Sequence, residues 1–151
     1  MANFTTLTAN TRRSGGCLCG AVRYEARGPL RPVVYCHCSQ CRRTTGHFLA
    51  ATAVAKDELV IDPDADLCWF ASSESASRGF CGRCGSSLFW VSEAEDYICI
   101  MAGSLDDPGG IEAVEHVFVD DKPDYYQLND DLPKHPGGGH QGYWFRGSRS
   151  G

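Results

Sequence analysis

The sequence predicts a mainly β domain of short strands and tight turns, with at most short helical turns. Two observations lead to this fold class. Apolar stretches are short, and segments rich in glycine, proline or serine separate them. No long stretch repeats its apolar residues with the 3.6-residue period of an amphipathic helix. A third observation indicates what joins the strands, because the chain contains 9 cysteines and most of them are clustered.

The elements are expected in the following order. Residues 21–26 alternate, with Val22, Tyr24 and Ala26 on one face, which is typical of a half-buried strand. A short strand at 33–35 leads into a cysteine-rich turn, and 39–45 can form one or two helical turns that Gly46 ends. Further strands are expected at 48–54, 59–61, 68–70, 88–91, 97–101 and 114–119.

Length and composition indicate one domain. The chain has 151 residues, of which 42% are hydrophobic and 22% charged, as is usual for a globular protein. We expect a polar N-terminal arm at 1–14, a cysteine-rich folded domain at 15–134, and a flexible C-terminal tail at 135–151. The tail prediction depends on the prolines and the Gly137–Gly139 run.

Charge and hydropathy exclude several classes of partner. The formal net charge is −5, which argues against a nucleic-acid partner, since such proteins normally present a basic face. No run is apolar enough to predict a membrane span. The first residues are polar and show no signal-peptide pattern, so we expect a cytoplasmic protein with reduced cysteines. Clustered thiols in a reducing compartment indicate metal ligands.

Four cysteines form a complete set of zinc ligands. A C-x-C pair and a C-x-x-C pair, each flanked by glycine, supply Cys17, Cys19, Cys81 and Cys84. Zinc in structural sites takes four ligands in a tetrahedron, and a site that joins distant segments stabilises a β-rich domain. The alternatives are disulfides or reduced cysteines in the core, and the expected reducing compartment argues against the first of them.

Three further cysteines form a C-x-C-x-x-C turn. Cys36, Cys38 and Cys41 can supply three zinc ligands but no fourth, so the fourth position is either open, as in catalytic sites, or closed by a histidine. His37 is an awkward ligand because neighbouring side chains in an extended segment point to opposite sides. His47 is the better candidate to close the site. The more distant histidines that stay possible are His116, His135 and His140.

Three segments together resemble the CENP-V/GFA family, whose namesake is glutathione-dependent formaldehyde-activating enzyme. They are Gly15 to Tyr24, Tyr35 to Gly46 and Phe80 to Leu88, and the resemblance extends over residues 14–134. It implies a Mss4-like fold of zinc-clamped β-sheets and two zinc ions per chain. It also implies a structural zinc on the first cysteine set, a catalytic zinc on the second, and a carbon–sulfur lyase.

The resemblance suggests a mechanism. A thiol such as glutathione, or another small thiol, would bind the open zinc position and add to an aldehyde, or the adduct would break down in reverse. His37 and His47 are the nearest candidates for the general base, and Arg42 and Arg43 either attract a substrate carboxylate or are solvated surface charges. The alternative function is a non-enzymatic zinc-stabilised binding module of the same fold.

Two cysteines stand apart from these clusters. Cys68 and Cys99 lie singly within apolar stretches. Free cysteine is among the most frequently buried residue types, so we expect both side chains in the hydrophobic core.

Overall fold

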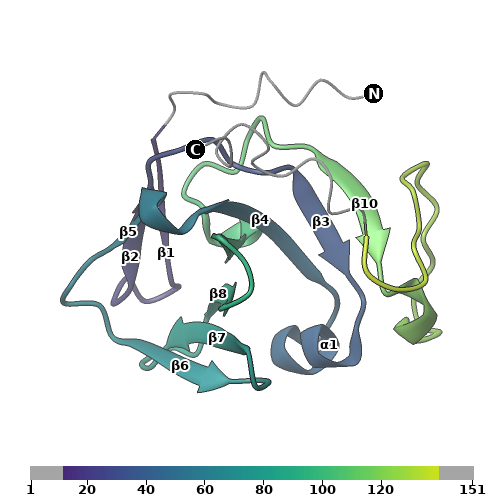
Figure 1. Ribbon diagram of the computed structural model, residues 1–151, viewed down its shortest axis with the longest axis horizontal. Coiled ribbons are helices and arrows are strands. Elements are labelled where there is room, and N and C mark those ends of the chain that lie inside the picture. Colours follow the sequence, from purple (N-terminus) through teal and green to yellow (C-terminus); the bar gives the residue numbers. More distant parts are fainter. Residues whose placement is uncertain (1–11, 140–151) are drawn as a thin grey trace.

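Two β-sheets account for most of the fold in the computed structural model, which describes residues 12–139 (Figure 1). Most of the predicted arm at 1–14 and of the predicted tail at 135–151 lies outside these residues. The smaller sheet is antiparallel, and its order is β1 (Arg13–Gly16), β2 (Arg23–Ala26), β5 (Leu59–Ile61). The mainly β fold class is therefore confirmed.

The larger sheet has seven strands. Its order is β10 (Ala113–Val117), β3 (Val33–Cys36), β4 (Leu49–Ala55), β9 (Tyr97–Met101), β8 (Ser87–Ser92), β7 (Ala76–Cys81), β6 (Leu67–Ala71). All neighbours pair antiparallel except β10 and β3, which are parallel. The sequence did not predict β1 or β7, because their glycines and serines resemble turn segments.

Helical segments are short, as predicted. One α-helix, α1 (Ser39–Thr45), begins where the Cys38 sulfur accepts a hydrogen bond from the Cys41 amide, and ends at Gly46 with a left-handed φ of 84°. The 3-10 segments are η2 (Lys56–Glu58), η3 (Ala102–Ser104) and η4 (Val119–Asp121). Within residues 12–139, none of these helices is long and apolar enough to cross a bilayer.

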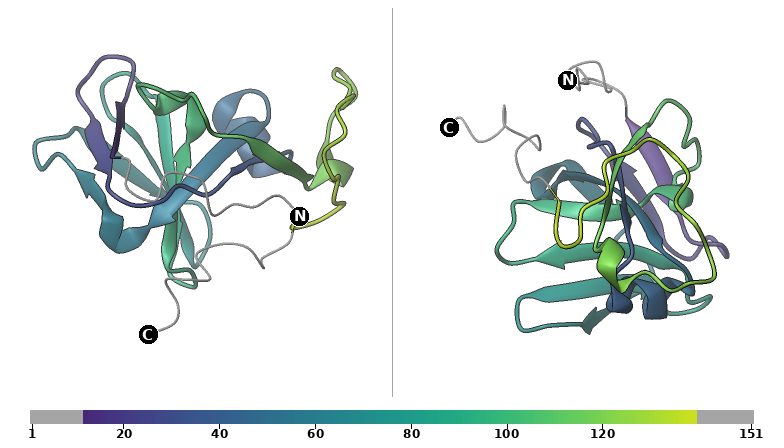
Figure 2. Two further views of the ribbon diagram at one scale, coloured as in Figure 1. Left: turned by 90° about the horizontal axis from the view of Figure 1, so that it is seen from above. Right: turned by 90° about the vertical axis from the view of Figure 1, so that its right-hand side faces the viewer.

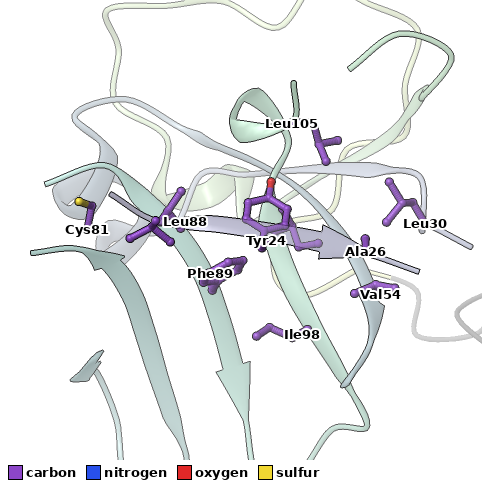
Figure 3. Packing of buried hydrophobic residues seen from close by; sticks show 11 residues of the cluster. Tyr24, Ala26, Leu30, Val54, Cys81, Leu88, Phe89, Ile98 and Leu105 are labelled. Atoms are coloured by element: carbon purple, nitrogen blue, oxygen red, sulfur yellow. The ribbon is translucent and has the colours of Figure 1, made fainter. Parts of the chain in front are cut away.

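The main hydrophobic core lies between the two sheets (Figure 3). Val22, Tyr24 and Ala26 are fully or almost fully buried there, as their alternation predicted. The Tyr24 ring meets the Phe89 ring of β8 edge to face, with 5.1 Å between centroids. Val54 of β4 also faces this core.

The opposite face of the seven-stranded sheet supports the candidate site. Because side chains alternate along a strand, the residues beside the core positions of β4, β8 and β9 point the other way. The pairing places Ala53, Cys99, Trp90 and Arg78 next to one another across four neighbouring strands. Helix α1 joins β3 to β4. It lies between these two strands and the β6–β7 end of the same sheet (Figure 1).

The segment after β10 runs along the edge of the larger sheet that β10 forms. The left view in Figure 2 shows it at one side of the molecule, and in the right view it faces the viewer. The amides of Phe118 and His135 bond to the carbonyls of Gly137 and His116, at 2.8 and 2.9 Å. The strand predicted at 114–119 ends at Val117, since Phe118 takes a left-handed conformation with φ 56°.

Candidate metal centres and an adjoining cavity

The first cysteine set comes together between the two sheets. The loop after β1 brings Cys17 and Cys19, and the turn after β7 brings Cys81 and Cys84, so that all four Sγ atoms lie within 4.8 Å of one another. The Cys17–Cys19 and Cys19–Cys81 sulfur distances are 3.6 and 3.8 Å. A tetrahedron with zinc–sulfur bonds of about 2.3 Å has edges of roughly 3.8 Å, so the set fits this ion.

Backbone amides donate hydrogen bonds to two of these sulfurs. Cys17 accepts from the Val22 amide at 3.2 Å, and Cys81 accepts from the amides of Arg83 and Cys84 at 3.3 and 3.4 Å. Hydrogen bonds from the side chain and backbone of Ser86 lower the pKa of Cys84 to about 5. All nine cysteines are free, so neither pair is a disulfide. The set could therefore hold a metal ion.

The second set occupies the turn from β3 into α1. Cys36 ends the strand, Cys38 caps the helix and Cys41 lies buried in it, and their Sγ atoms also lie within 4.8 Å of one another. Hydrogen bonds from the Cys36 and Cys41 thiols and from backbone amides lower the pKa of Cys38 to about 2. Among residues 12–139, no histidine or carboxylate joins this group as a fourth ligand.

His37 points away from the triad into a buried hydrogen-bonded chain. Its Nδ1 lies 2.6 Å from the Tyr126 hydroxyl, and its Nε2 lies 2.9 Å from Nδ1 of His116. His116 Nε2 lies 2.8 Å from Asp130. The carboxylate requires a proton on His116 Nε2, so His37 donates to His116 and accepts from Tyr126. Burial, with the charges of His116 and Lys122, lowers the pKa of His37 to about 4, so the ring is neutral at pH 7.

The other histidines also have partners outside the triad. His47 is exposed, and its Nδ1 lies 3.1 Å from the Tyr125 hydroxyl, with the two rings stacked. His135 Nε2 lies 3.0 Å from the Glu115 carboxylate. His140 lies outside the described residues. Neither His37 nor His47 lines the cavity beside the triad.

A cavity of about 340 Å³ lies against the three cysteines. Its floor is the face of the seven-stranded sheet that looks away from the main core, with Val34, Ala51, Trp90, Tyr97 and Cys99 exposed to it. Phe118 and the glycines 138 and 139 supply the wall on the β10 side. The volume is at the small end of the range for ligand pockets.

Two arginines line this cavity, and the sequence analysis had singled out neither. Arg31 is buried, and its Nη2 donates to the Ala51 carbonyl at 2.8 Å. Arg78 of β7 reaches across to α1, where its Nη2 lies 3.2 Å from Gln40 Oε1 and 3.8 Å from Cys41 Sγ. Both residues can be read from the sequence, but only the fold places their side chains in the wall of this cavity.

The expected arginines lie elsewhere. Arg42 and Arg43 belong to α1 but do not line the cavity, and Arg43 is exposed. Successive residues on a helix point in different directions, so proximity in sequence to Cys41 does not bring them to the same side.

Glu115 is the carboxylate that lines the cavity among the described residues. Only 3% of it is exposed, and its partner is His135. A Cβ atom on Gly139 would lie 2.3 Å from Glu115 Oε1, so the chain can cover the carboxylate this closely only with glycine.

The two isolated cysteines have different positions. Cys68 is exposed on β6, the edge strand, so the prediction that it is a core residue was wrong: its apolar neighbours Trp69 and Phe70 are exposed as well. Cys99 is partly buried beside Cys41 and lines the cavity, where burial raises its pKa.

Comparison with known proteins places this chain in a family. The family model described as glutathione-dependent formaldehyde-activating enzyme, GFA, matches residues 12–121. An "uncharacterized lyase" of Schizosaccharomyces pombe is 30% identical over 116 residues, which are 76% of this chain and 83% of the relative.

Two further comparisons agree with this match. A Halomonas elongata protein, whose name proposes a glutathione-dependent formaldehyde-activating enzyme, is 30% identical over 126 residues, covering 76% of this chain and 79% of the relative. A crystal structure of a Rhodobacter sphaeroides protein, a structural genomics target, shares the fold with a TM-score of 0.53. That structure is 24% identical and covers 67% of this chain and 99% of its own.

Proposed function

Because the chain belongs to the glutathione-dependent formaldehyde-activating enzyme family, we propose that it is a zinc-dependent carbon–sulfur lyase. Its substrate is the adduct of a small thiol, glutathione or another, with an aldehyde. Two zinc ions bind per chain: a structural ion on Cys17, Cys19, Cys81 and Cys84, and a catalytic ion on Cys36, Cys38 and Cys41.

One observation carries this proposal. The triad offers three sulfur ligands, no fourth protein ligand accompanies them within residues 12–139, and a cavity opens on the same three sulfurs. A structural zinc site has four protein ligands, whereas a catalytic site leaves a position for a substrate. The candidate histidines within residues 12–139 have other partners, which supports the enzyme over the binding module.

Each part of the site has its own role in the reaction. Zinc bound at the triad supplies a centre that takes a fourth thiolate and lowers the pKa of the substrate thiol. The apolar floor of the cavity excludes water from the adduct. As the carbon–sulfur bond of the adduct breaks, its electron pair goes to sulfur, and the hydroxyl oxygen loses its proton and becomes the aldehyde carbonyl. The reverse sequence forms the adduct.

We assign the acceptance of this proton to Glu115. Its carboxylate lines the cavity, whereas the rings of His37 and His47 do not. His135 Nε2 lies 3.0 Å from this carboxylate and holds it in position. Of the two histidines predicted as bases, His37 then has a positioning role, because its bonds to Tyr126 and His116 fix the segment between Cys36 and Cys38.

Cobalt substitution tests the open position. Co²⁺ bound to thiolates shows charge-transfer bands, and these should change when glutathione or 3-mercaptopropionate is added. The affinity should rise with pH, since the thiolate is the ligand. The response should vanish in Cys38→Ala and persist in Cys68→Ser, because Cys68 is exposed and outside both clusters.

A spectrum that ignores every added thiol would mean that the coordination sphere is closed. The binding-module function would then replace the enzyme. The same preparation should contain close to two metal ions per chain by elemental analysis, and a single ion would contradict the two-site assignment.

A further inference from the structure

We propose that Arg78 is a specificity-determining residue that binds a carboxylate of the thiol substrate, and that this carboxylate lies only two or three bonds from the sulfur. The inference rests on the proposed function, since it places the substrate thiol at the triad. The substrate class is therefore a short mercaptocarboxylate, in which one small molecule carries both groups.

The first argument is the position of the guanidinium. Arg78 Nη2 lies 3.8 Å from Cys41 Sγ, and the Arg78 side chain lines the cavity that opens on the triad. A carboxylate bound by a guanidinium sits about 2.7–2.9 Å from its nitrogens. A thiol bound beside Cys41 and a carboxylate bound by Arg78 are thus separated by only a few ångströms, which is the span of a two- or three-carbon chain.

The second argument is that Arg78 is held in place and has no carboxylate partner among residues 12–139. Gln40 accepts from Arg78 Nη2 at 3.2 Å, and the Gln40 amide nitrogen in turn donates to the Ser72 carbonyl at 3.2 Å. Within residues 12–139, no aspartate or glutamate forms an ion pair with Arg78. The guanidinium faces the cavity with hydrogen-bond donors that an anionic ligand can use in a bidentate manner.

The third argument is the arrangement of the other charges. Glu115, the carboxylate of the cavity wall, has His135 as its ion-pair partner, with His135 Nε2 at 3.0 Å. Among residues 12–139 it forms no ion pair with Arg78, so the positive charge next to the triad has no acidic partner on this wall. Glutathione differs from a short mercaptocarboxylate because its cysteine carboxyl is part of a peptide bond, so its carboxylates lie at the chain ends.

A matched pair of thiols tests the inference on the unaltered protein. Binding of 3-mercaptopropionate and of 3-mercaptopropionamide to the cobalt-substituted protein is compared by titration at equal thiolate concentrations. The two ligands have nearly the same shape and differ in charge. The carboxylate should bind about 10- to 100-fold more tightly, the range expected for a hydrogen bond to a charged group.

Variants of the protein test whether Arg78 causes the preference for the carboxylate ligand over the amide ligand. Arg78→Gln should remove the preference for the carboxylate and leave the affinity for the amide unchanged, and Arg78→Lys should keep part of the preference. Arg43→Gln, which removes an exposed charge outside the cavity, should behave like the unaltered protein. Glutathione should bind with an affinity that Arg78→Gln changes little.

The outcomes separate this inference from the proposed function. Three results would overturn the role of Arg78 while the thiol-binding site stands. They are equal affinities for the two thiols in the unaltered protein, an equal loss of affinity for both in Arg78→Gln, and a contribution of Arg78 to glutathione affinity as large as its contribution to 3-mercaptopropionate affinity. Failure of all thiols to bind would overturn the proposed function itself. The ligand comparison does not depend on whether the Arg78 variants fold.

Discussion

The two cysteine clusters should differ sharply in what they contribute to stability. Replacing Cys17 and Cys19 by serine removes the link between segments that are 62 residues apart, as measured from Cys19 to Cys81. By the chain-entropy relation for a cross-link, closing such a loop is worth about 4 kcal/mol. The triad closes a loop of only about six residues, for which the same relation gives about 2 kcal/mol.

Serine is the right replacement because it keeps the local structure. Cys38 caps α1 by accepting from the Cys41 amide, and loss of a cap costs about 1 kcal/mol, but a serine hydroxyl also accepts this bond. The double variant Cys36→Ser/Cys38→Ser therefore isolates the metal cross-link. For a chain of this size about 2–4 °C of melting temperature corresponds to 1 kcal/mol. We expect losses of roughly 8–16 °C for the first variant and roughly 4–8 °C for the second.

The assay is thermal unfolding followed by circular dichroism, with the zinc content of each variant determined by elemental analysis. Each double variant should retain one zinc ion. If the triad variant loses as much melting temperature as the Cys17/Cys19 variant, both sites are structural and the reasoning from loop length fails. The reasoning from loop length would also be refuted if the Cys17/Cys19 variant lost one zinc ion without any change in melting temperature.

Two further predictions concern single residues. Glu115→Gln should lower the rate of adduct breakdown by about 10²- to 10⁴-fold, the usual contribution of general base catalysis, and should retain thiol affinity. Asp131→Asn, at an exposed position, is the control. An unchanged rate in Glu115→Gln would exclude Glu115 as the proton acceptor. Burial raises the pKa of Tyr24 to about 12. Because the folded-state pKa lies above the unfolded value of about 10, stability is fully present below pH 10 and decreases by roughly 2–3 kcal/mol as pH rises toward 12. Tyr24→Phe should lose much less over this window in urea titrations, and an equal loss in both proteins would contradict the assignment.

The sequence was most informative where a local pattern carried the information. The alternation of Val22, Tyr24 and Ala26 predicted the buried face of β2, and glycine at position 46 predicted the end of α1. The structure brings together the same two sets of sulfur atoms that the spacing had grouped, because each set comes from only one or two short turns.

The cavity could not be predicted in the same way, because it depends on pairing between distant strands. Arg78 reaches the triad only through the order of β7, β8, β9 and β4 in the sheet, and Glu115 only through parallel pairing of β10 with β3. From the sequence, Arg42 and Arg43 were either candidates to attract a substrate carboxylate, as neighbours of Cys41, or solvated surface charges, and these side chains do not line the cavity. Cys68 was misplaced because an apolar stretch on an edge strand resembles one in the core.

The parallel pairing of β10 with β3 also affects the order in which the site is assembled during synthesis. The chain leaves the ribosome from its N-terminus, and domains begin to fold in that order. Cys36, Cys38 and Cys41 emerge long before Glu115, Phe118 and the glycines at 138 and 139 that complete the cavity. The nascent triad is therefore open to solvent while the last strand is still being made. A metal ion could therefore reach the triad before the C-terminal segment completes the wall of the cavity.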